Sequence, residues 1–279
     1  MKKMYLSPLF VAMFGLTACG GTSSSSTTDA AADGHATHTS TWSYEGWNGP
    51  TYWGDLIGHD GTLYPTCGTG TTQSPINLTA ADQQALTNIT FNYTNNTDTV
   101  INNGHTVQVN ASDTATSSIT VDGKTYKVLQ VHFHSPSEHE VDGKLADAEF
   151  HIVHQADDDS LAVVGILLNG GASTENAGYA SLITQFAETK GHEYSEVNLT
   201  SAIDFNDLLP AAGSRATYRY TGSLTTPPCS ENVKWHVMTS AIDVTDAQIT
   251  ALKEYFDGNN RPVNAIDKHV LIQDTTAAQ

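Results

Sequence analysis

Three histidines on two short segments have the spacing of a metal site. His132 and His134 are separated by one residue, and His151 stands two residues after Glu149 in an alternating apolar segment. In a β-strand, residues two apart point to the same face of the sheet, so two such strands side by side would bring the three imidazoles to one point. Three neutral imidazoles with one coordination position left for water are typical of a catalytic zinc site.

A chance arrangement is the alternative to a metal site. The chain contains 12 histidines, and a His-x-His pair on a half-exposed strand is often only a surface feature. A third histidine in a second predicted strand favours the metal site over a chance arrangement. From these residues alone both interpretations stay open.

The sequence around these histidines predicts mostly short strands. Apolar and polar residues alternate in four segments, Ile89–Tyr93, His105–Val109, Ser118–Val121 and Lys124–Val128. Asp122-Gly123 predicts a tight turn between the last two segments. Leu161–Leu168 is a continuous apolar run, which predicts a central strand buried on both faces.

Helical spacing of apolar residues occurs in two segments, Ala180–Phe186 and Asp246–Phe256. For the second, Asp243 or Thr245 is available as the N-cap, and Gly258 is expected to end the helix. No repeat and no Gly/Ser linker divides this region. The sequence therefore predicts a single, mainly β domain over residues 41–275 with peripheral short helices, followed by a tail, 276–279.

The composition is strongly acidic. Of 279 residues, 12 are Lys or Arg and 30 are Asp or Glu, and the formal net charge is −18. Little positive charge is available to neutralise a row of phosphates, so nucleic acid is excluded as a partner. An acidic, lysine-poor surface stays hydrated and soluble.

The N-terminus predicts export. Lys2 and Lys3 precede an apolar stretch, about residues 5–16, that is too short to span a membrane. The tetrapeptide Leu-Thr-Ala-Cys ending at Cys19 resembles a bacterial lipobox, which implies a signal peptide, 1–18, and lipidation of the cysteine. An ordinary secretory signal is the alternative.

The residues after Cys19 extend this prediction. Gly20 resembles the sorting signal for the outer membrane of Gram-negative bacteria, and residues 19–40 have the composition of a flexible tether. We therefore expect an exported, lipid-anchored protein on the outer membrane, facing the periplasm or the cell surface.

Cysteine counting agrees with export. Without Cys19, Cys67 and Cys229 remain, and an even pair in an exported protein usually forms a disulfide. Two free buried thiols are the alternative.

A series of short motifs follows along the predicted domain. They are Trp42–Gly46, Gly49–Pro50, Trp53–Gly54, Gln73–Asn77, Asn102–His105, Gln130–His134, Ser137–His139, Glu149–His154, Gly222–Cys229 and Asn260–Pro262. Each motif is weak by itself. Their joint order and spacing resemble the α-class carbonic anhydrases, in the form that bacteria export, over nearly the whole predicted domain.

This resemblance implies a fold and an activity. The fold is a central, mostly antiparallel, ten-stranded twisted sheet with the metal at the bottom of a cone-shaped cleft. The activity is the zinc-dependent, reversible hydration of carbon dioxide to bicarbonate and a proton, by attack of zinc-bound hydroxide. The residues suit this chemistry, because zinc held by three neutral imidazoles lowers the pKa of bound water to about 7.

The resemblance also assigns the metal site. The implied zinc ligands are His132, His134 and His151. Gln130 and Glu149 match the partners that hold the second ring nitrogens of the first and last ligands. The partner of the middle ligand is a backbone carbonyl, expected to be that of Asn259.

Further roles follow by the same resemblance. Glu138 and Thr225 match the pair that orients the hydroxide, and Thr226 matches a neighbour that contacts bicarbonate. His105 matches the proton shuttle at the cleft mouth, since an imidazole titrates near neutral pH. The polar residues implied to order water are Tyr44, Asn103 and Gln108, the last standing where asparagine is commoner. The apolar wall implied for carbon dioxide is Val153, Val163, Leu224, Val233 and Trp235.

Other residues of these motifs are implied to be structural. His139 and His154 match hydrogen-bonding histidines behind the site rather than ligands. Cys67 and Cys229 match the disulfide of exported members. Pro227-Pro228 is expected to hold a cis bond.

Other functions fit less well. Residues 132–139 superficially resemble the His-x-His-x-Asp-His of metallo-β-lactamase-like enzymes, but the spacing is too long and alternating βα units are absent. The alternative is a catalytically silent carbonic anhydrase-like binding protein, which typically lacks a zinc histidine, or a zinc-scavenging surface protein, which needs neither Thr225 nor His105. The expected partners are carbon dioxide and bicarbonate, with the membrane reached only through the lipid anchor. A homodimer stays open, because the sequence shows no interface signal.

Overall fold

The computed structural model describes residues 42–58, 61–79, 81–94, 99–112, 114–266 and 268–276. All of them belong to one compact unit, Thr37–Gln279. The predicted signal peptide 1–18, the lipidation site Cys19 and the tether 19–40 lie outside the described residues. Among the described residues, no helix has the length and apolar content needed to cross a membrane.

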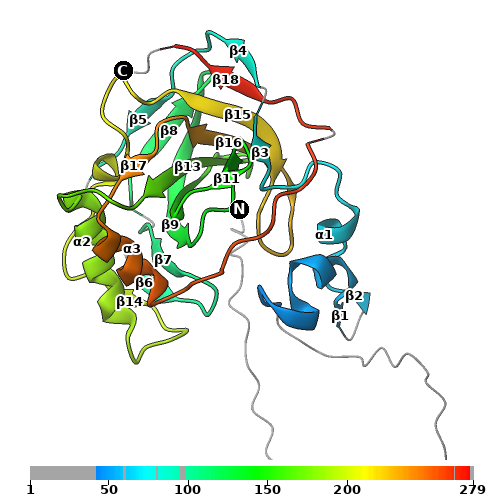
Figure 1. The fold of residues 1–279 in the computed structure, drawn as a ribbon, viewed down its shortest axis with the longest axis horizontal. Coiled ribbons are helices and arrows are strands. Elements are labelled where there is room, and N and C mark those ends of the chain that lie inside the picture. The colour runs from blue at the N-terminus through cyan, green and yellow to red at the C-terminus, as the bar shows by residue number, and fades with distance from the viewer. Residues whose placement is uncertain are drawn as a thin grey trace, which may run out of the picture. The chain divides into compact units, whose positions relative to one another are not determined.

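A large twisted sheet dominates the fold (Figure 1). Ten strands form its path, in the order β14 (Val197–Asn198), β6 (Thr99–Asn102), β7 (Val107–Asn110), β9 (Lys124–His134), β12 (Ala148–Gln155), β13 (Leu161–Asn169), β16 (Glu231–Met238), β15 (Thr217–Ser223), β18 (Ile272–Asp274) and β4 (Asp82–Gln84). Along this path the β13–β16 and β18–β4 pairs are parallel and the others antiparallel. The predicted fold class, a mainly β domain on a large and mostly antiparallel twisted sheet, is confirmed, but the predicted count of ten strands is too low, because the described residues form a sheet of 13 strands.

Shorter elements complete the architecture. Three further strands join this sheet: β5 (Thr90–Asn92) and β8 (Ser118–Val121), which pair with each other, and β17 (Ile242–Asp243), which pairs with β13. Small separate ladders contain β1 (Ile57–Gly58), β2 (Gly61–Thr62), β3 (Asn77–Leu78), β10 (Glu140–Val141) and β11 (Lys144–Leu145). The helices are α1 (Pro65–Thr69), α2 (Ala177–Phe186) and α3 (Asp246–Lys253), with 3-10 turns at η1 (Gly46–Asn48), η2 (Pro50–Asp55), η3 (Ala187–Thr189) and η4 (Phe205–Leu208).

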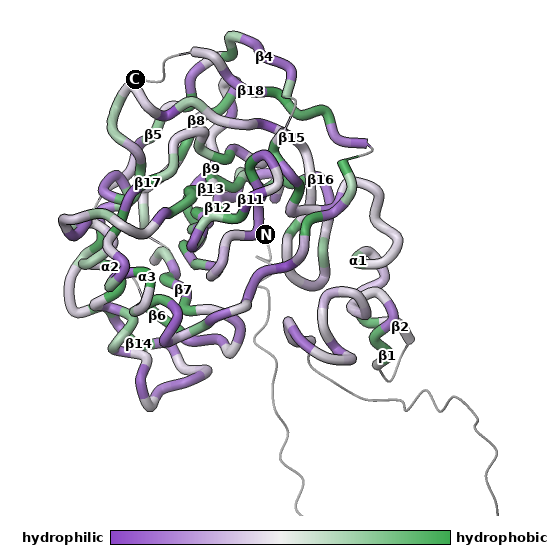
Figure 2. Tube along the Cα trace, viewed as in Figure 1, coloured by the Kyte–Doolittle hydropathy of each residue, from purple (hydrophilic) through white to green (hydrophobic). Residues whose placement is uncertain are grey.

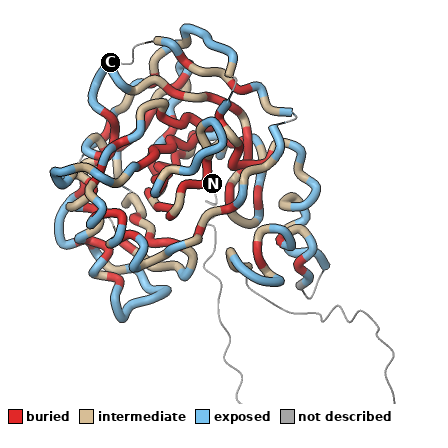
Figure 3. Tube along the Cα trace, viewed as in Figure 1, coloured by how far each residue is buried: buried red, intermediate tan, exposed pale blue. Residues whose placement is uncertain are grey.

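The central strands separate two apolar clusters. On β12, Phe150 and Ile152 point into the larger cluster, which also contains residues of α2 and α3. Val153 points to the opposite face, into a smaller cluster with Trp235. The alternation along one strand therefore sends apolar side chains to both faces, and Figures 2 and 3 show hydrophobic, buried chain concentrated in these central strands.

The predicted strands form, with one late start and one extension. The segment predicted as His105–Val109 begins its strand, β7, only at Val107, which leaves His105 on the preceding turn. Lys124–Val128 and the histidine segment are not separate elements but one strand of 11 residues, β9. Asp122 and Gly123 precede it with φ angles of 49° and 78°, as a two-residue turn between strands requires. The predicted buried strand is β13, whose interior residues are all buried.

Both predicted helices form, but the predicted end of the second is wrong. Thr245 caps α3, and a capping box joins it to Gln248. The helix ends at Lys253, before Gly258. The N–H of Gly258 instead donates to the carbonyl of Ser135 at 2.6 Å, which ties the chain after α3 to the end of β9.

Candidate metal centre

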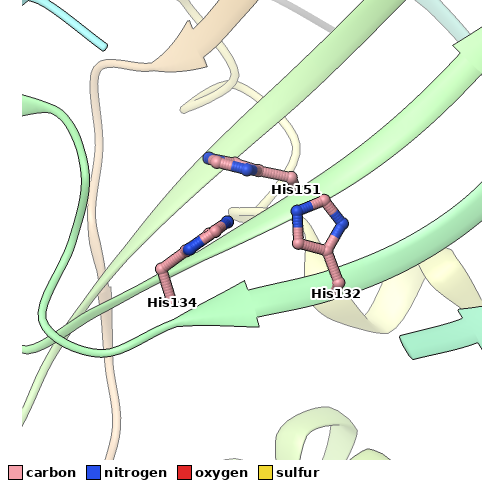
Figure 4. Close-up of side chains that lie close together, drawn as sticks. All are labelled: His132, His134 and His151. Atoms are coloured by element: carbon pink, nitrogen blue, oxygen red, sulfur yellow. The ribbon is translucent and has the colours of Figure 1, made fainter. Parts of the chain in front are cut away.

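The three predicted ligand histidines converge. His132 and His134 lie on β9, and His151 lies on β12 directly opposite His132 in the antiparallel register. One ring nitrogen from each of the three lies within 4.8 Å of the others. Figure 4 shows the rings turned toward one another from the two strands.

Each ring is held by a hydrogen bond through its other nitrogen. His132 Nδ1 lies 2.8 Å from Gln130 Oε1, and His134 Nδ1 lies 2.7 Å from the carbonyl of Asn259. These partners are acceptors, so both nitrogens carry the hydrogen and each ring leaves Nε2 as a lone pair.

The third ring is turned the other way. His151 Nε2 lies 2.9 Å from Glu149 Oε1, so this ring carries its hydrogen on Nε2 and leaves Nδ1 as the lone pair. The three rings are thereby fixed in the tautomers that a metal ion needs.

The free nitrogens fit a divalent cation. His134 Nε2 is buried and has no hydrogen-bond partner among the described residues, which is costly unless a ligand fills the gap. Burial lowers the pKa of His132 well below its usual value and that of His134 to about 4, and it also lowers the pKa of His151. The rings therefore stay neutral at pH 7, the form in which imidazole binds zinc.

Glu149 is a fully buried acceptor of four hydrogen bonds. Its Oε2 accepts the backbone N–H groups of Glu138 and His139, at 2.9 and 2.8 Å. Its Oε1 contacts His139 Nδ1 at 2.7 Å and His151 Nε2 at 2.9 Å. Burial alone would raise the pKa of Glu149, but His139 and His151 outweigh it and hold this pKa well below the usual value. His139, Glu149 and His151 are also close enough to hold a metal, but these hydrogen bonds already occupy their atoms.

His139 and His154 are held away from the ligand set. His139 Nε2 lies 2.7 Å from the hydroxyl of Tyr220. His154 Nε2 lies 2.9 Å from the hydroxyl of Tyr93. The structure thus places both histidines in buried hydrogen-bond networks.

Glu138 lies beside the free nitrogens. Its Oε2 is 3.4 Å from His134 Nε2 and has no hydrogen-bond partner among the described residues. Its Oε1 accepts the backbone N–H of Arg261 at 2.9 Å. Burial raises the pKa of Glu138 to about 7, while the nearby His151 and the hydroxyl of Thr225 act in the opposite direction. A nearby cation would favour the charged form further.

His105 stands on a turn between β6 and β7. Its ring is half-buried and stacks on Trp42, with ring centroids 3.6 Å apart, and burial lowers the pKa of its imidazole. Its backbone carbonyl accepts from the side-chain amide of Asn259 at 3.0 Å. Asn259 therefore contacts both this turn and the ligand His134.

Two of the three residues expected to order water, Asn103 and Gln108, form hydrogen bonds within the protein. Asn103 Oδ1 accepts the N–H groups of His105 and Thr106, both at 3.0 Å. The side-chain amide of Gln108 donates to Asn110 Oδ1. Burial, followed by the charge of Glu138, raises the pKa of Tyr44 well above its usual value, so the phenol stays neutral.

The residues expected to form the apolar wall meet in one cluster. Its buried members include Val153, Val163, Val233 and Trp235, and Leu224 packs against them. The Trp235 ring centroid lies 4.8 Å from that of His151. Thr225 is buried and Thr226 half-buried in the turn that follows β15.

The disulfide and the cis bond are present. Cys67 and Cys229 are joined, and the Pro227–Pro228 bond is cis. The N–H of Cys229 donates to the carbonyl of Thr226 at 2.8 Å. The bridge is thus attached to the turn that carries Thr225.

Sequence reasoning missed three contacts of the site. They are the stacking of Trp42 on His105, the side-chain bonds of Asn259, and the N–H of Arg261 that holds Glu138. Arg261 lies in the motif Asn260–Pro262 and Asn259 directly precedes it. This motif was the one feature of the sequence that could have indicated their contacts. Nothing in the local sequence pairs Trp42 with a residue so far along the chain.

Comparison with known proteins identifies similar chains. Residues 48–272 match the family described as eukaryotic-type carbonic anhydrase. A carbonic anhydrase of Klebsiella pneumoniae is 37% identical over 235 residues, which cover 83% of this chain and 90% of that protein. Dioscorin dioA3 of Dioscorea japonica is 35% identical over 216 residues, 76% of each chain.

A solved structure agrees with these relatives. The α-carbonic anhydrase from Thermovibrio ammonificans, in complex with the inhibitor sulfanilamide, superimposes with a TM-score of 0.75 at 35% identity. The match covers 84% of this chain and 100% of that one.

Proposed function

The chain belongs to the α-carbonic anhydrase family and is a carbonic anhydrase, and we propose that it hydrates carbon dioxide reversibly through a zinc ion held by His132, His134 and His151. One observation carries the proposal. Three neutral imidazoles, each with one nitrogen held by an acceptor, turn their other nitrogens to a common point. When bound there, zinc supplies a Lewis acid that makes water nucleophilic near neutral pH.

Thr225 and Glu138 would orient a hydroxyl hydrogen beside the point where the free histidine nitrogens meet. In the proposed reaction the hydroxyl of Thr225 would donate to Glu138, and the N–H of Arg261 keeps the carboxylate in place. A hydroxyl that has given its one hydrogen to Glu138 can only accept on its remaining side. Thr225 would therefore orient a reacting oxygen that still carries a hydrogen, with its lone pair turned toward the substrate.

The remaining residues bind substrate and move the proton. Carbon dioxide is small and apolar, and we propose that it rests against the cluster of Val153, Val163 and Trp235, which excludes water from the site. Thr226 would contact the product bicarbonate. His105 would take up the proton at its imidazole and pass it to buffer, because an imidazole titrates near neutral pH.

A silent binding protein or zinc scavenger is the other candidate. Such a protein needs the three histidines but has no use for a buried carboxylate beside their free nitrogens. The fully buried carboxylate of Glu138, 3.4 Å from His134 Nε2, favours the enzyme.

One experiment tests the proposal. Zinc content and stopped-flow hydration of carbon dioxide with a pH indicator are measured on the same purified sample, beside His134→Ala as the control. We expect one zinc per chain and rapid hydration, both lost in the variant. A folded, zinc-loaded sample that is no faster than buffer would reject the function.

We also propose that the mature protein begins at a lipidated Cys19 and is held by its tether to the outer membrane of a Gram-negative bacterium. The Leu-Thr-Ala-Cys sequence supports this. Mass spectrometry of the N-terminal peptide tests it: an acylated Cys19 is expected, and a free terminus at another residue would contradict the proposal. Cys19→Ala should release the protein from membranes.

A further inference from the structure

The turn that carries His105 is built around a glycine. Gly104 has a φ of +83°, in the left-handed region that glycine adopts readily. Asn102 Oδ1 accepts the N–H of Gly104 at 3.0 Å, and Asn103 Oδ1 accepts the N–H of His105 at 3.0 Å. Because glycine has many accessible conformations, these bonds alone leave the direction in which His105 projects open to change.

Tyr194, from a different part of the chain, covers this glycine. A Cβ atom at position 104 would lie 2.7 Å from both Cε1 and the hydroxyl oxygen of Tyr194, so the tip of the phenol ring occupies the space beside Gly104. The N–H of Tyr194 donates to the carbonyl of Asn102 at 2.8 Å. The ring and the backbone N–H of Tyr194 thus contact two residues of the same turn, Gly104 and Asn102.

The conformation of Tyr194 is unusual for an exposed residue. Its φ is +64°, which costs a non-glycine residue about 1–2 kcal/mol, and 74% of its surface is exposed. The contact therefore buries little apolar area in return. Strained backbone of this kind is a reason to look for a role other than stability.

The surrounding strands bring the two segments together. Tyr194 belongs to the loop before β14, and β14 pairs with β6, the strand that leads into the His105 turn. Figure 1 shows β14, β6 and β7 side by side. On the other side of the turn, Asn259 holds the carbonyl of His105 at 3.0 Å.

We propose that Tyr194 is a positioning residue for proton transfer: its ring and its N–H hold the Asn102–Thr106 turn, so that the imidazole of His105 stays in one orientation. This inference rests on the proposed shuttle role of His105. Small displacements of a reacting group are costly to a transfer that depends on its position, while the three ligand histidines lie on β9 and β12, outside this turn.

Tyr194→Gly tests the inference without adding backbone strain, because glycine accepts the positive φ. In dilute buffer we expect kcat to fall roughly three- to ten-fold, with kcat/KM within two-fold of the starting protein and kcat restored by concentrated imidazole. Tyr194→Phe keeps the ring and should behave as the starting protein. His192→Ala removes another exposed ring from the same loop and is the matched control. Tyr194→Asn, which also tolerates positive φ, repeats the test if the glycine variant folds poorly.

The outcomes separate this inference from the proposed function. If His105→Ala is slow in dilute buffer and Tyr194→Gly is not, the role of Tyr194 is wrong and the shuttle stands. If kcat and kcat/KM of Tyr194→Gly fall together, the ring supports the metal centre instead, and the inference is again wrong. If His105→Ala itself is as fast as the starting protein, the shuttle assignment and this inference both fail, while zinc-dependent hydration is unaffected.

A second readout is independent of catalysis. Amide order parameters from NMR relaxation should fall at Gly104 and His105 in Tyr194→Gly and stay unchanged in Tyr194→Phe. Equal order parameters in both variants would contradict the positioning role.

Discussion

The indole of Trp42 lies nearly parallel to the imidazole of His105, with ring centroids 3.6 Å apart and 12° between the planes. The stack covers one face of the imidazole, and burial lowers its pKa. The proton acceptor proposed for this enzyme is therefore less basic than a free histidine.

Trp42→Ala should raise the pKa of His105 toward 6.5, because water would then solvate the imidazolium. NMR titration of the His105 ring protons measures this pKa. Trp47→Ala, which removes an exposed indole from the same N-terminal segment, is the control and should leave the titration unchanged. An unchanged pKa in Trp42→Ala would mean that other groups desolvate the ring.

Glu138→Gln should lower kcat/KM by roughly 10²–10³-fold, the usual effect of removing one orienting group from a preorganised site. A glutamine amide can donate as well as accept, so it no longer fixes the direction of the Thr225 hydroxyl. Zinc content should stay at one per chain, since Glu138 holds none of the ligand rings. Glu140→Gln, on the neighbouring strand β10, is the control, and loss of zinc from Glu138→Gln would show that its carboxylate supports the ligands instead.

Gln130→Ala should weaken zinc binding about 10- to 100-fold. The amide of Gln130 holds His132 Nδ1 at 2.8 Å, so without it the ring can rotate and change tautomer. Competition with a chelator of known affinity measures the change. Lys127→Ala, on the exposed side of the same strand, should bind zinc as the starting protein does; equal affinity in both variants would contradict the role of Gln130.

Reduction of the disulfide should lower the free energy of unfolding by about 5 kcal/mol, from the chain entropy of a loop closed across 162 residues. Guanidinium unfolding with and without reductant measures the difference. The double variant Cys67→Ser/Cys229→Ser should be equally destabilised and insensitive to reductant. A loss much smaller than this would mean that the reduced, unfolded chain retains structure.

The metal centre could be predicted from the sequence because its geometry is local. Spacing by two residues places His132 and His134 on one face of any strand, and the same rule groups Glu149 with His151. Strand pairing alone then brings the two segments together, as the β9–β12 register shows. The strands themselves were predictable for the same reason.

The contacts made by the segment after α3, which folds back over the sheet, could not be predicted in this way. Asn259 reaches His134 and His105 only because the chain after α3 folds back across the end of β9, where Gly258 bonds Ser135. Helix propensities and the position of Gly258 predicted a helix that runs up to this glycine. They gave no indication that its N–H donates to the carbonyl of Ser135. The contact of Tyr194 with Gly104 is also set by tertiary structure, since a tyrosine at positive φ has no sequence signature.

A buried histidine outside the site should make the protein sensitive to acid. His236 on β16 is 5% exposed, and neither ring nitrogen has a hydrogen-bond partner among the described residues. Burial, with the nearby charge of Arg219, lowers its pKa to about 3. Between pH 6.5 and about 3 the unfolded chain therefore binds a proton that the folded chain does not, so stability from this residue is lost as the pH falls through that window and is unaffected above it.

His236→Leu should consequently stabilise the protein more at low pH than at high pH. At pH 8 the gain is about 1 kcal/mol, from removing unpaired buried nitrogens, and at pH 4 it should be about 3 kcal/mol larger, from about 2.5 pKa units at 1.36 kcal/mol each. Urea unfolding of both proteins at pH 8, 6, 5 and 4 gives the difference directly. His236→Gln removes the titration but keeps a buried polar group, so it should show the gain at low pH without the gain at pH 8. A difference between His236→Leu and the starting protein that stays constant from pH 8 to pH 4 would mean that His236 is already solvated in the folded chain.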